Sequence, residues 1–225
     1  MLDNIPKNNI QFFTASSFTD FTYKKEDVDL QGWGGNAPIL TNLVKSKMPK
    51  RIADVGVWKG QSTITMAKAA KENNNSAEVF AIDTWIGSPQ HWYNLESFPF
   101  LESLKLVHGF PSLYYTFLAN VFDNNVDNLI IPVPATSESA YHLFMLEEIR
   151  FDMIHIDAAH EYDPVKRDVE NYWELLNDNG VMVCDDYSIH WPGVYRAVNE
   201  FVEKNNIRFE SYNTKGVLYK DLKSN

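Results

Sequence analysis

Three aspartates with the chemistry of metal ligands follow two short apolar stretches in the second half of the chain. Asp157 comes directly after Phe151–Ile156, and Asp185 and Asp186 come directly after residues 181–184. Both stretches have the length and apolar content of strands that are buried on two faces. A helix between two such strands joins them as parallel neighbours, so both strands end at the same edge of the sheet. In open α/β sheets ligands bind at this carboxyl edge.

Three carboxylates at one edge repel one another, and a divalent cation such as Mg²⁺ relieves this because it prefers oxygen ligands. His160 lies three residues after Asp157 and is close enough to the same edge to act as a base. These side chains therefore predict a metal site with an adjacent proton acceptor. The alternative is that each aspartate only caps the helix or loop that follows its strand.

The segment that positions these residues is a predicted helix over residues 161–177. Apolar side chains recur along it at helical spacing and predict one buried face; they are Val165, Val169, Tyr172, Trp173 and Leu176. Asn179-Gly180 is expected to end this segment before the next strand, since glycine suits a left-handed helix cap.

A second group of candidate residues surrounds a glycine-bearing turn earlier in the chain. The predicted strand Arg51–Val55 runs into Gly56 and Gly60, and a helix is expected over residues 62–71. Such a turn lets a ligand approach the backbone and the helix N-terminus closely. The spacing lacks the G-x-G-x-x-G pattern of dinucleotide folds, so a nicotinamide cofactor is disfavoured.

Asp83 follows the next predicted strand, residues 78–82, and lies some twenty residues beyond the glycine turn. A carboxylate in this place can accept hydrogen bonds from both hydroxyls of a ribose. Its alternative role is a helix cap.

Together these motifs resemble a known family. The segments IHIDAAHEYDPVKRD and CDDY, with DTW-x-G at residues 83–87 and PATSESA at residues 134–140, are similar to class I S-adenosylmethionine-dependent methyltransferases of the "domain 24" kind. Within these, the chain resembles the metal-dependent sugar O-methyltransferases of macrolide biosynthesis and the cephalosporin-hydroxylase-like proteins. The motifs span roughly residues 51–187.

The resemblance implies roles for individual residues. Asp157, Asp185 and Asp186 would hold Mg²⁺, and His160 would be the general base. The S-adenosylmethionine site would draw on the glycine turn, on the end of the second strand and on the segment beside the adenine; its residues would be Asp54, Gly56, Gly60, Ser62, Asp83, Thr84, Trp85 and Ser137. Asp54 would serve the ammonium group directly or through water, and Trp85 would cover either the adenine or the acceptor.

The fold expected from this pattern is α/β: one Rossmann-like domain over residues 1–225, with a doubly wound, mostly parallel seven-stranded sheet. Further strands are predicted over residues 129–133, 207–212 and 216–219, the last two as an antiparallel pair with a turn at Asn213-Thr214-Lys215. Further helices are expected over residues 38–48, 137–147 and 194–204. Residues 1–35 would form an arm or lid, and residues 88–128 an aromatic-rich insert with one or two helices, the clearer at 114–121.

The composition of the chain favours some classes of binding partner over others. The formal net charge is −10, without a Lys/Arg run, which argues against a nucleic-acid partner and leaves a small molecule or sugar as the expected substrate. The one cysteine, Cys184, excludes an internal disulfide and fits the cytoplasm. No apolar run predicts a membrane span. The aromatic arm and insert predict a homodimer or larger assembly. A metal-dependent hydrolase and a non-catalytic binding protein remain as alternatives.

Overall fold

A seven-stranded mixed sheet forms the centre of the computed structural model, which describes residues 20–74, 76–93 and 100–221. The strand order is β3-β2-β1-β4-β5-β7-β6, with β1 to β5 parallel and β7 antiparallel to both β5 and β6. The strands are β1 (Arg51–Val55), β2 (Glu78–Asp83), β3 (Ile130–Pro134), β4 (Phe151–Ile156), β5 (Leu176–Cys184), β6 (Arg208–Tyr212) and β7 (Lys215–Tyr219). The doubly wound sheet with its antiparallel end is therefore confirmed.

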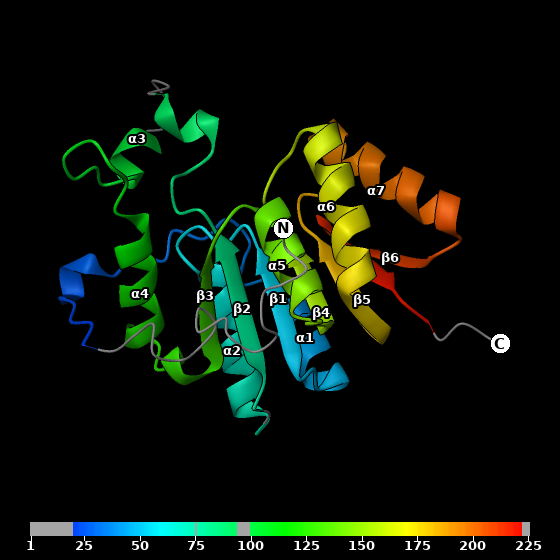
Figure 1. Ribbon diagram of the computed structural model, residues 1–225, viewed down its shortest axis with the longest axis horizontal. Coiled ribbons are helices and arrows are strands. Elements are labelled where there is room, and N and C mark those ends of the chain that lie inside the picture. The colour runs from blue at the N-terminus through cyan, green and yellow to red at the C-terminus, as the bar shows by residue number, and fades with distance from the viewer. Residues whose placement is uncertain (1–19, 75, 94–99, 222–225) are drawn as a thin grey trace.

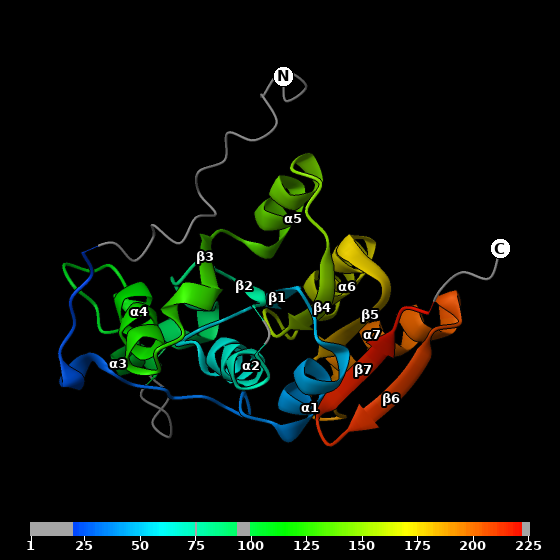
Figure 2. The same ribbon diagram turned by 90° about the horizontal axis from the view of Figure 1, so that it is seen from below.

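Helices cover both faces of the sheet, as Figures 1 and 2 show. One face packs against α1 (Pro38–Lys47), α2 (Gln61–Glu72) and α4 (Leu113–Asp123), and the other against α5 (Ser137–Leu146), α6 (Tyr162–Leu175) and α7 (Pro192–Asn205). Alternation along β1 sends Ile52 into the first layer and Ala53 into the second. Strands buried on both faces are apolar until they end, so polar groups gather at the carboxyl edge.

The insert between β2 and β3 contains the predicted helical structure. It comprises the 3₁₀ helix η4 (Pro89–Trp92), the short α3 (Phe100–Ser103), α4 and the 3₁₀ helix η5 (Asp127–Leu129). In Figure 1 the insert extends beyond the upper ends of β2 and β3. Residues 94–99, with Phe98 among them, lie outside the described residues.

The described part of the arm, from residue 20 onward, packs against the insert and the first βα turn. It includes the 3₁₀ helix η3 (Lys25–Asp27), and it is held to α4 by Asn120, whose amide oxygen accepts from Asp29 N at 2.8 Å while its nitrogen donates to Asp29 O at 2.9 Å. Phe12, Phe13 and Phe18 of the predicted arm lie outside the described residues.

Several predicted boundaries differ from the structure, most clearly at the end of α6 and at the C-terminal hairpin. Helix α6 ends at Leu175, and β5 begins at Leu176 with a register irregularity before Val181. Asn179 rather than Gly180 takes the left-handed conformation, with φ 62°. At the C-terminal hairpin, Lys215 is the first residue of β7 rather than part of the turn. Among the described residues, no helix combines the length and hydropathy of a transmembrane segment.

Candidate active site at the carboxyl edge of the sheet

Three of the predicted residues meet at the carboxyl edge of β4 and β5. His160 Nε2 lies 2.9 Å from Asp186 Oδ2, and Asp157, His160 and Asp186 place one possible ligand atom each within 4.8 Å of one another. His160 stacks on Trp191, with ring centroids 4.1 Å apart. The side chains of His160 and Asp186 are only partly exposed, at 22% and 31%. A histidine paired with a carboxylate has a fixed orientation and can accept a proton from a nearby hydroxyl.

The strand turns out of the sheet between the two neighbouring aspartates. Asp186 has a φ of 54°, in the left-handed region, and follows the last residue of β5 by two positions. Consequently Asp186 faces His160, whereas Asp185 is buried, with only 5% of its surface exposed.

Asp185 lies in a second group of possible ligand atoms, with His155 and Asp157, and both of its oxygens already have a partner. Its Oδ1 accepts from Asp186 N at 2.7 Å, and its Oδ2 is hydrogen-bonded to Lys215, the first residue of β7. Burial would raise the pKa of Asp185, but His155 and Lys215 hold it below its usual range. The geometry therefore leaves Asp157 and Asp186 as the carboxylates that face the site.

His155 connects this edge with the glycine turn. It lies on β4 in register with Asp54 of β1, is fully buried, and its Nδ1 is 2.7 Å from Asp54 Oδ1. Its Nε2 is 3.4 Å from Asp185 Oδ2. Burial would lower the pKa of His155, but the carboxylates of Asp185 and Asp54 outweigh this and raise it to about 10. The two flanking carboxylates favour the imidazolium form of His155, and in that form the ring cannot ligate a metal.

The carboxylate of Asp157 lies near two others, those of Asp185 and Asp186. Burial raises the pKa of Asp157 well above its usual range, and Asp185 raises it further; His155 lowers it, Asp186 raises it by less, and Lys215 lowers it by the least. A carboxylate in this environment is stabilised by a bound cation.

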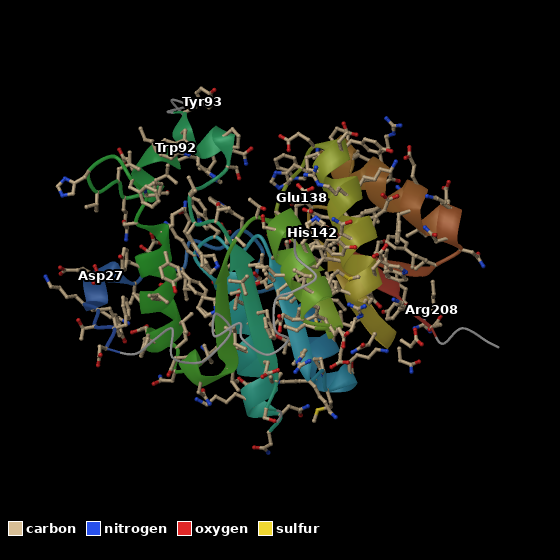
Figure 3. All side chains as sticks on the ribbon, viewed as in Figure 1. Asp27, Trp92, Tyr93, Glu138, His142 and Arg208 are labelled. Carbon is tan, nitrogen blue, oxygen red and sulfur yellow. The ribbon has the colours of Figure 1, made fainter. Side chains whose placement is uncertain are left out.

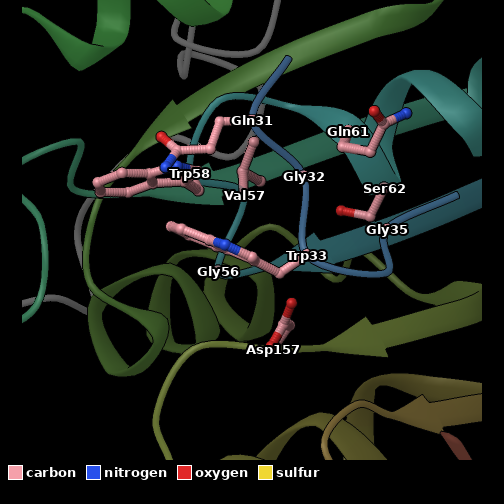
Figure 4. Close-up of a pocket in the computed structure, with 10 residues that line it drawn as sticks. All are labelled: Gln31, Gly32, Trp33, Gly35, Gly56, Val57, Trp58, Gln61, Ser62 and Asp157. Atoms are coloured by element: carbon pink, nitrogen blue, oxygen red, sulfur yellow. The ribbon is translucent and has the colours of Figure 1, made fainter. Parts of the chain in front are cut away.

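A pocket lies between the glycine turn, the start of α2 and Asp157 (Figure 4). Gly56 has a φ of 90°, and a Cβ there would meet Asp157 O at 2.1 Å, so only glycine allows β1 and β4 to approach in this way. Gly60 has a φ of 96° and precedes α2. The turn and the helix N-terminus therefore have the geometry that suits an anionic or polar ligand group.

Asp54 lies beneath this pocket rather than in it. The residue is fully buried, and its Oδ2 accepts from Ser62 Oγ at 2.8 Å and from the hydroxyl of Thr63, while Oδ1 faces His155. Direct contact with a ligand ammonium group would have to displace these partners. The geometry thus assigns Asp54 and the hydroxyl of Ser62 to holding the turn.

Asp83 organises two turns at the end of β2. Its Oδ2 accepts from Trp58 N at 2.8 Å and its Oδ1 from Trp85 N at 2.7 Å. Burial raises the pKa of Asp83 despite these N–H donors, which lower it. The N–H of Val57 is a third donor, so three of the four carboxylate lone pairs are used and one stays open to a ribose hydroxyl of a nucleoside. The adjacent Thr84 is exposed.

The ring of Trp85 is enclosed by the insert, contrary to the expectation that it would cover a ligand. Trp85 is 2% exposed, packs against Tyr114 and Phe117 with ring centroids 4.8 and 4.9 Å away, and donates from Nε1 to Trp58 O at 2.9 Å. It therefore offers no ring face to adenine or to an acceptor. The indoles that line the pocket are those of Trp58 and of Trp33 in the arm, the latter 53% exposed.

Ser137 begins α5 beside a buried carboxylate. The side chain of Asp168 on α6 is hydrogen-bonded to Ser137, and Tyr172 donates to Ser137 O at 3.0 Å. Burial raises the pKa of Asp168 to about 6, although the bond from Ser137 lowers it. Within the described part of the chain, no group donates to Asp168 Oδ1.

The arm is fastened over the pocket by a buried lysine. Lys59 is 1% exposed and donates to Asp29 at 2.6 Å and to Gln31 at 2.7 Å. Gln31, Gly32, Trp33 and Gly35 line the pocket, and a Cβ at Gly35 would lie 2.8 Å from Ser62 N. The arm therefore contacts the start of α2.

Sequence reasoning overlooked four of these residues: Lys59, His155, Asp168 and Lys215. His155 carried one detectable signal, since it is the only ionisable residue in the inner part of an otherwise apolar strand. Its partners, and the partner of Lys215, depend on the strand order, which the sequence does not specify.

The sheet order and a glycine turn that leads into α2 define a class I methyltransferase fold. A methyltransferase domain family matches residues 53–187, and the chain belongs to that family.

Similar proteins agree with this fold. An O-methyltransferase from Bacillus cereus, solved in complex with SAH, aligns with a TM-score of 0.58 at 14% identity over 92% of this chain and 86% of that one. The calicheamicin methyltransferase CalS11 aligns with a TM-score of 0.59 at 17% identity over 81% of this chain and 76% of that one.

An uncharacterized protein, y4gI, from Sinorhizobium fredii is 24% identical over 198 residues, which make up 86% of this chain. The chain spans only 18% of the length of that relative.

Proposed function

We propose that the chain transfers a methyl group from S-adenosylmethionine to a hydroxyl oxygen of a small molecule or sugar. The observation that carries the proposal is the His160–Asp186 pair beside Asp157, at the edge where the pocket of the glycine turn also opens. The printed descriptions of similar structures, an O-methyltransferase with bound SAH and a calicheamicin methyltransferase, support this class of reaction.

In this proposal the cofactor lies along the carboxyl ends of β1 to β3. The turn at Gly56 and Gly60 faces its methionine portion, Asp83 and Thr84 face the ribose, and Ser137 lies beside the adenine. The side of the cofactor toward β4 would then present its methyl group near Asp157. A ligand held along this edge reacts with reduced loss of orientational freedom.

His160 is proposed to accept the proton of the acceptor hydroxyl. Asp186, 2.9 Å from His160 Nε2, orients the imidazole, and stacking on Trp191 restricts its rotation. Which ring nitrogen carries the proton follows from the hydrogen bond that the other makes. Transfer to oxygen needs this step because a neutral hydroxyl is a weak nucleophile.

The residues at the edge fit a magnesium ion, although with a different set from the predicted one. Asp157 and Asp186 would supply the carboxylate oxygens, which Mg²⁺ prefers to nitrogen, so His160 stays available as the base. A bound Mg²⁺ would lower the pKa of an acceptor hydroxyl and orient a vicinal diol.

A homodimer or larger assembly forms part of the proposal. The insert exposes several large apolar side chains at its outer end, among them Trp92 and Tyr93 (Figure 3), and Phe110 and Tyr115 are 65% and 63% exposed. In this proposal these exposed apolar side chains form the contact surface, since large exposed apolar side chains are typical of protein–protein interfaces.

Methyl transfer from radiolabelled S-adenosylmethionine to a panel of vicinal diols, catechols and sugars tests the proposal. We expect EDTA to abolish transfer, and His160→Ala to lower the rate by ~10²–10⁴, the usual share of a general base. The matched control is His190→Ala, since His190 is exposed on the neighbouring loop. Full activity in EDTA would contradict the metal part, and normal turnover by His160→Ala would contradict the assignment of the base.

A further inference from the structure

Four buried side chains with alternating charge run beneath the carboxyl edge, one from each of four adjacent strands or strand ends. Asp54 faces His155 at 2.7 Å, His155 faces Asp185 at 3.4 Å, and Asp185 is hydrogen-bonded to Lys215. Each of the four is at most 5% exposed. Two carboxylates and two cations make the row neutral, which is the condition under which buried charges are tolerated.

Lys215 is the end of this row that no motif predicted. It begins β7, and the next residue, Gly216, pairs with Cys184 of β5, so Lys215 lies in register with Asp185. It is 2% exposed, and the arm covers it: a Cβ at Gly34 would lie 3.6 Å from Lys215 Nζ. A lysine held this deeply is a fixed point charge rather than a mobile surface group.

We propose that Lys215 is a positioning residue that occupies the place of a metal ion at Asp185. This inference rests on the proposed function. In it, Asp157 and Asp186 bind a divalent cation at the edge, and Asp185 only orients Asp186 by accepting from the backbone N–H of Asp186. Oδ1 of Asp185 accepts from Asp186 N, and Oδ2 lies against both Lys215 Nζ and His155 Nε2, so a metal ion at Asp185 would have to bind beside two buried cationic groups.

The charges of Lys215 and Asp185 determine how tightly each variant should bind a divalent cation. Lys215 neutralises Asp185, so removing both charges together leaves the net charge around Asp157 and Asp186 unchanged. Removing Lys215 alone frees a carboxylate and removes a repelling cation, and both changes favour a divalent ion. Replacing a buried ion pair with neutral side chains of similar volume is often neutral for folding, whereas breaking the pair destabilises.

The test is calorimetric titration of the full chain with MnCl₂, without cofactor, on the wild type and five variants. We expect Lys215→Met/Asp185→Asn to keep the wild-type affinity within about threefold, because the charge is unchanged. Asp157→Asn and Asp186→Asn should each weaken Mn²⁺ binding by about tenfold or more, as expected for lost ligands. Lys215→Met alone should strengthen it by about tenfold.

A double variant that is folded by circular dichroism and binds Mn²⁺ tenfold more weakly than wild type would overturn the inference, because Asp185 would then be a ligand. The conservative Lys215→Arg variant should keep the wild-type affinity, which separates a role of the charge from a role in folding. Wild-type protein that binds no Mn²⁺ would also overturn the inference. Binding of S-adenosylhomocysteine to that same sample then shows whether the proposed methyltransferase function stands without it.

Discussion

The buried carboxyl group of Asp168 should make the stability of the domain depend on pH in a predictable direction. Burial raises its pKa from 3.8 to about 6, and the residue is only 2% exposed. A shift of ~2 units corresponds to ~3 kcal/mol at ~1.4 kcal/mol per unit. Because the folded-state pKa is raised, the folded protein binds the proton more tightly than the unfolded chain. Its free energy of unfolding should therefore fall as the pH rises from about 4 to above 6.

Asp168→Asn removes this titration while its amide oxygen can still accept from Ser137. Between about pH 4 and about pH 8 the stability of the variant relative to wild type should therefore rise by ~2–3 kcal/mol. Urea denaturation at several pH values measures this difference, and any constant effect of the amide cancels in its slope. Asp163→Asn, at an exposed position on the same helix, is the matched control and should show a much smaller pH dependence. If the difference in the free energy of unfolding between wild type and Asp168→Asn stays constant over this pH range, the pKa of Asp168 is not raised in the folded protein.

Three further predictions concern the core, the cofactor and the assembly. Trp85→Ala should lower the free energy of unfolding by ~3–5 kcal/mol because its ring is enclosed. Trp33→Ala is the control and should change this free energy by less than ~1 kcal/mol because its ring is half exposed. Equal effects of the two substitutions in thermal denaturation would contradict the placement of the two rings. Asp83→Ala should weaken S-adenosylmethionine binding by ~1–3 kcal/mol, and unchanged affinity in a folded variant would remove the ribose assignment. Light scattering should find a dimer or larger species at micromolar concentration, and a monomer would count against the apolar face of the insert as an interface.

The sequence predicted the parts of the fold that depend on local pattern. The strands Arg51–Val55 and Phe151–Ile156 have the predicted bounds because each is a short segment rich in apolar residues and is followed at once by Gly56 or Asp157. The boundary between α6 and β5 was missed, since Asn179 and Gly180 can both adopt left-handed backbone and the register irregularity depends on pairing with β4.

The candidate site was predictable only as a list of residue types at one edge. The sequence placed Asp157, His160 and Asp186 at that edge, and the structure brings them together. It could not show that Asp185 turns inward, because its partner Lys215 lies 30 residues away on a strand whose position in the sheet is set by tertiary packing. The enclosure of the Trp85 ring could not be predicted either, because the ring packs against Tyr114 and Phe117 of α4, whose position the sequence does not specify.

The proposal that the chain binds S-adenosylmethionine at the ends of β1 to β3 can be tested by measuring cofactor binding in the absence of metal. We expect calorimetry to show one S-adenosylhomocysteine bound per chain, with the same affinity in EDTA and in Mg²⁺, because the proposed cofactor contacts lie on β1 to β3 and the metal ligands on β4 and β5. A folded protein that binds neither S-adenosylhomocysteine nor S-adenosylmethionine would contradict the proposed methyltransferase function.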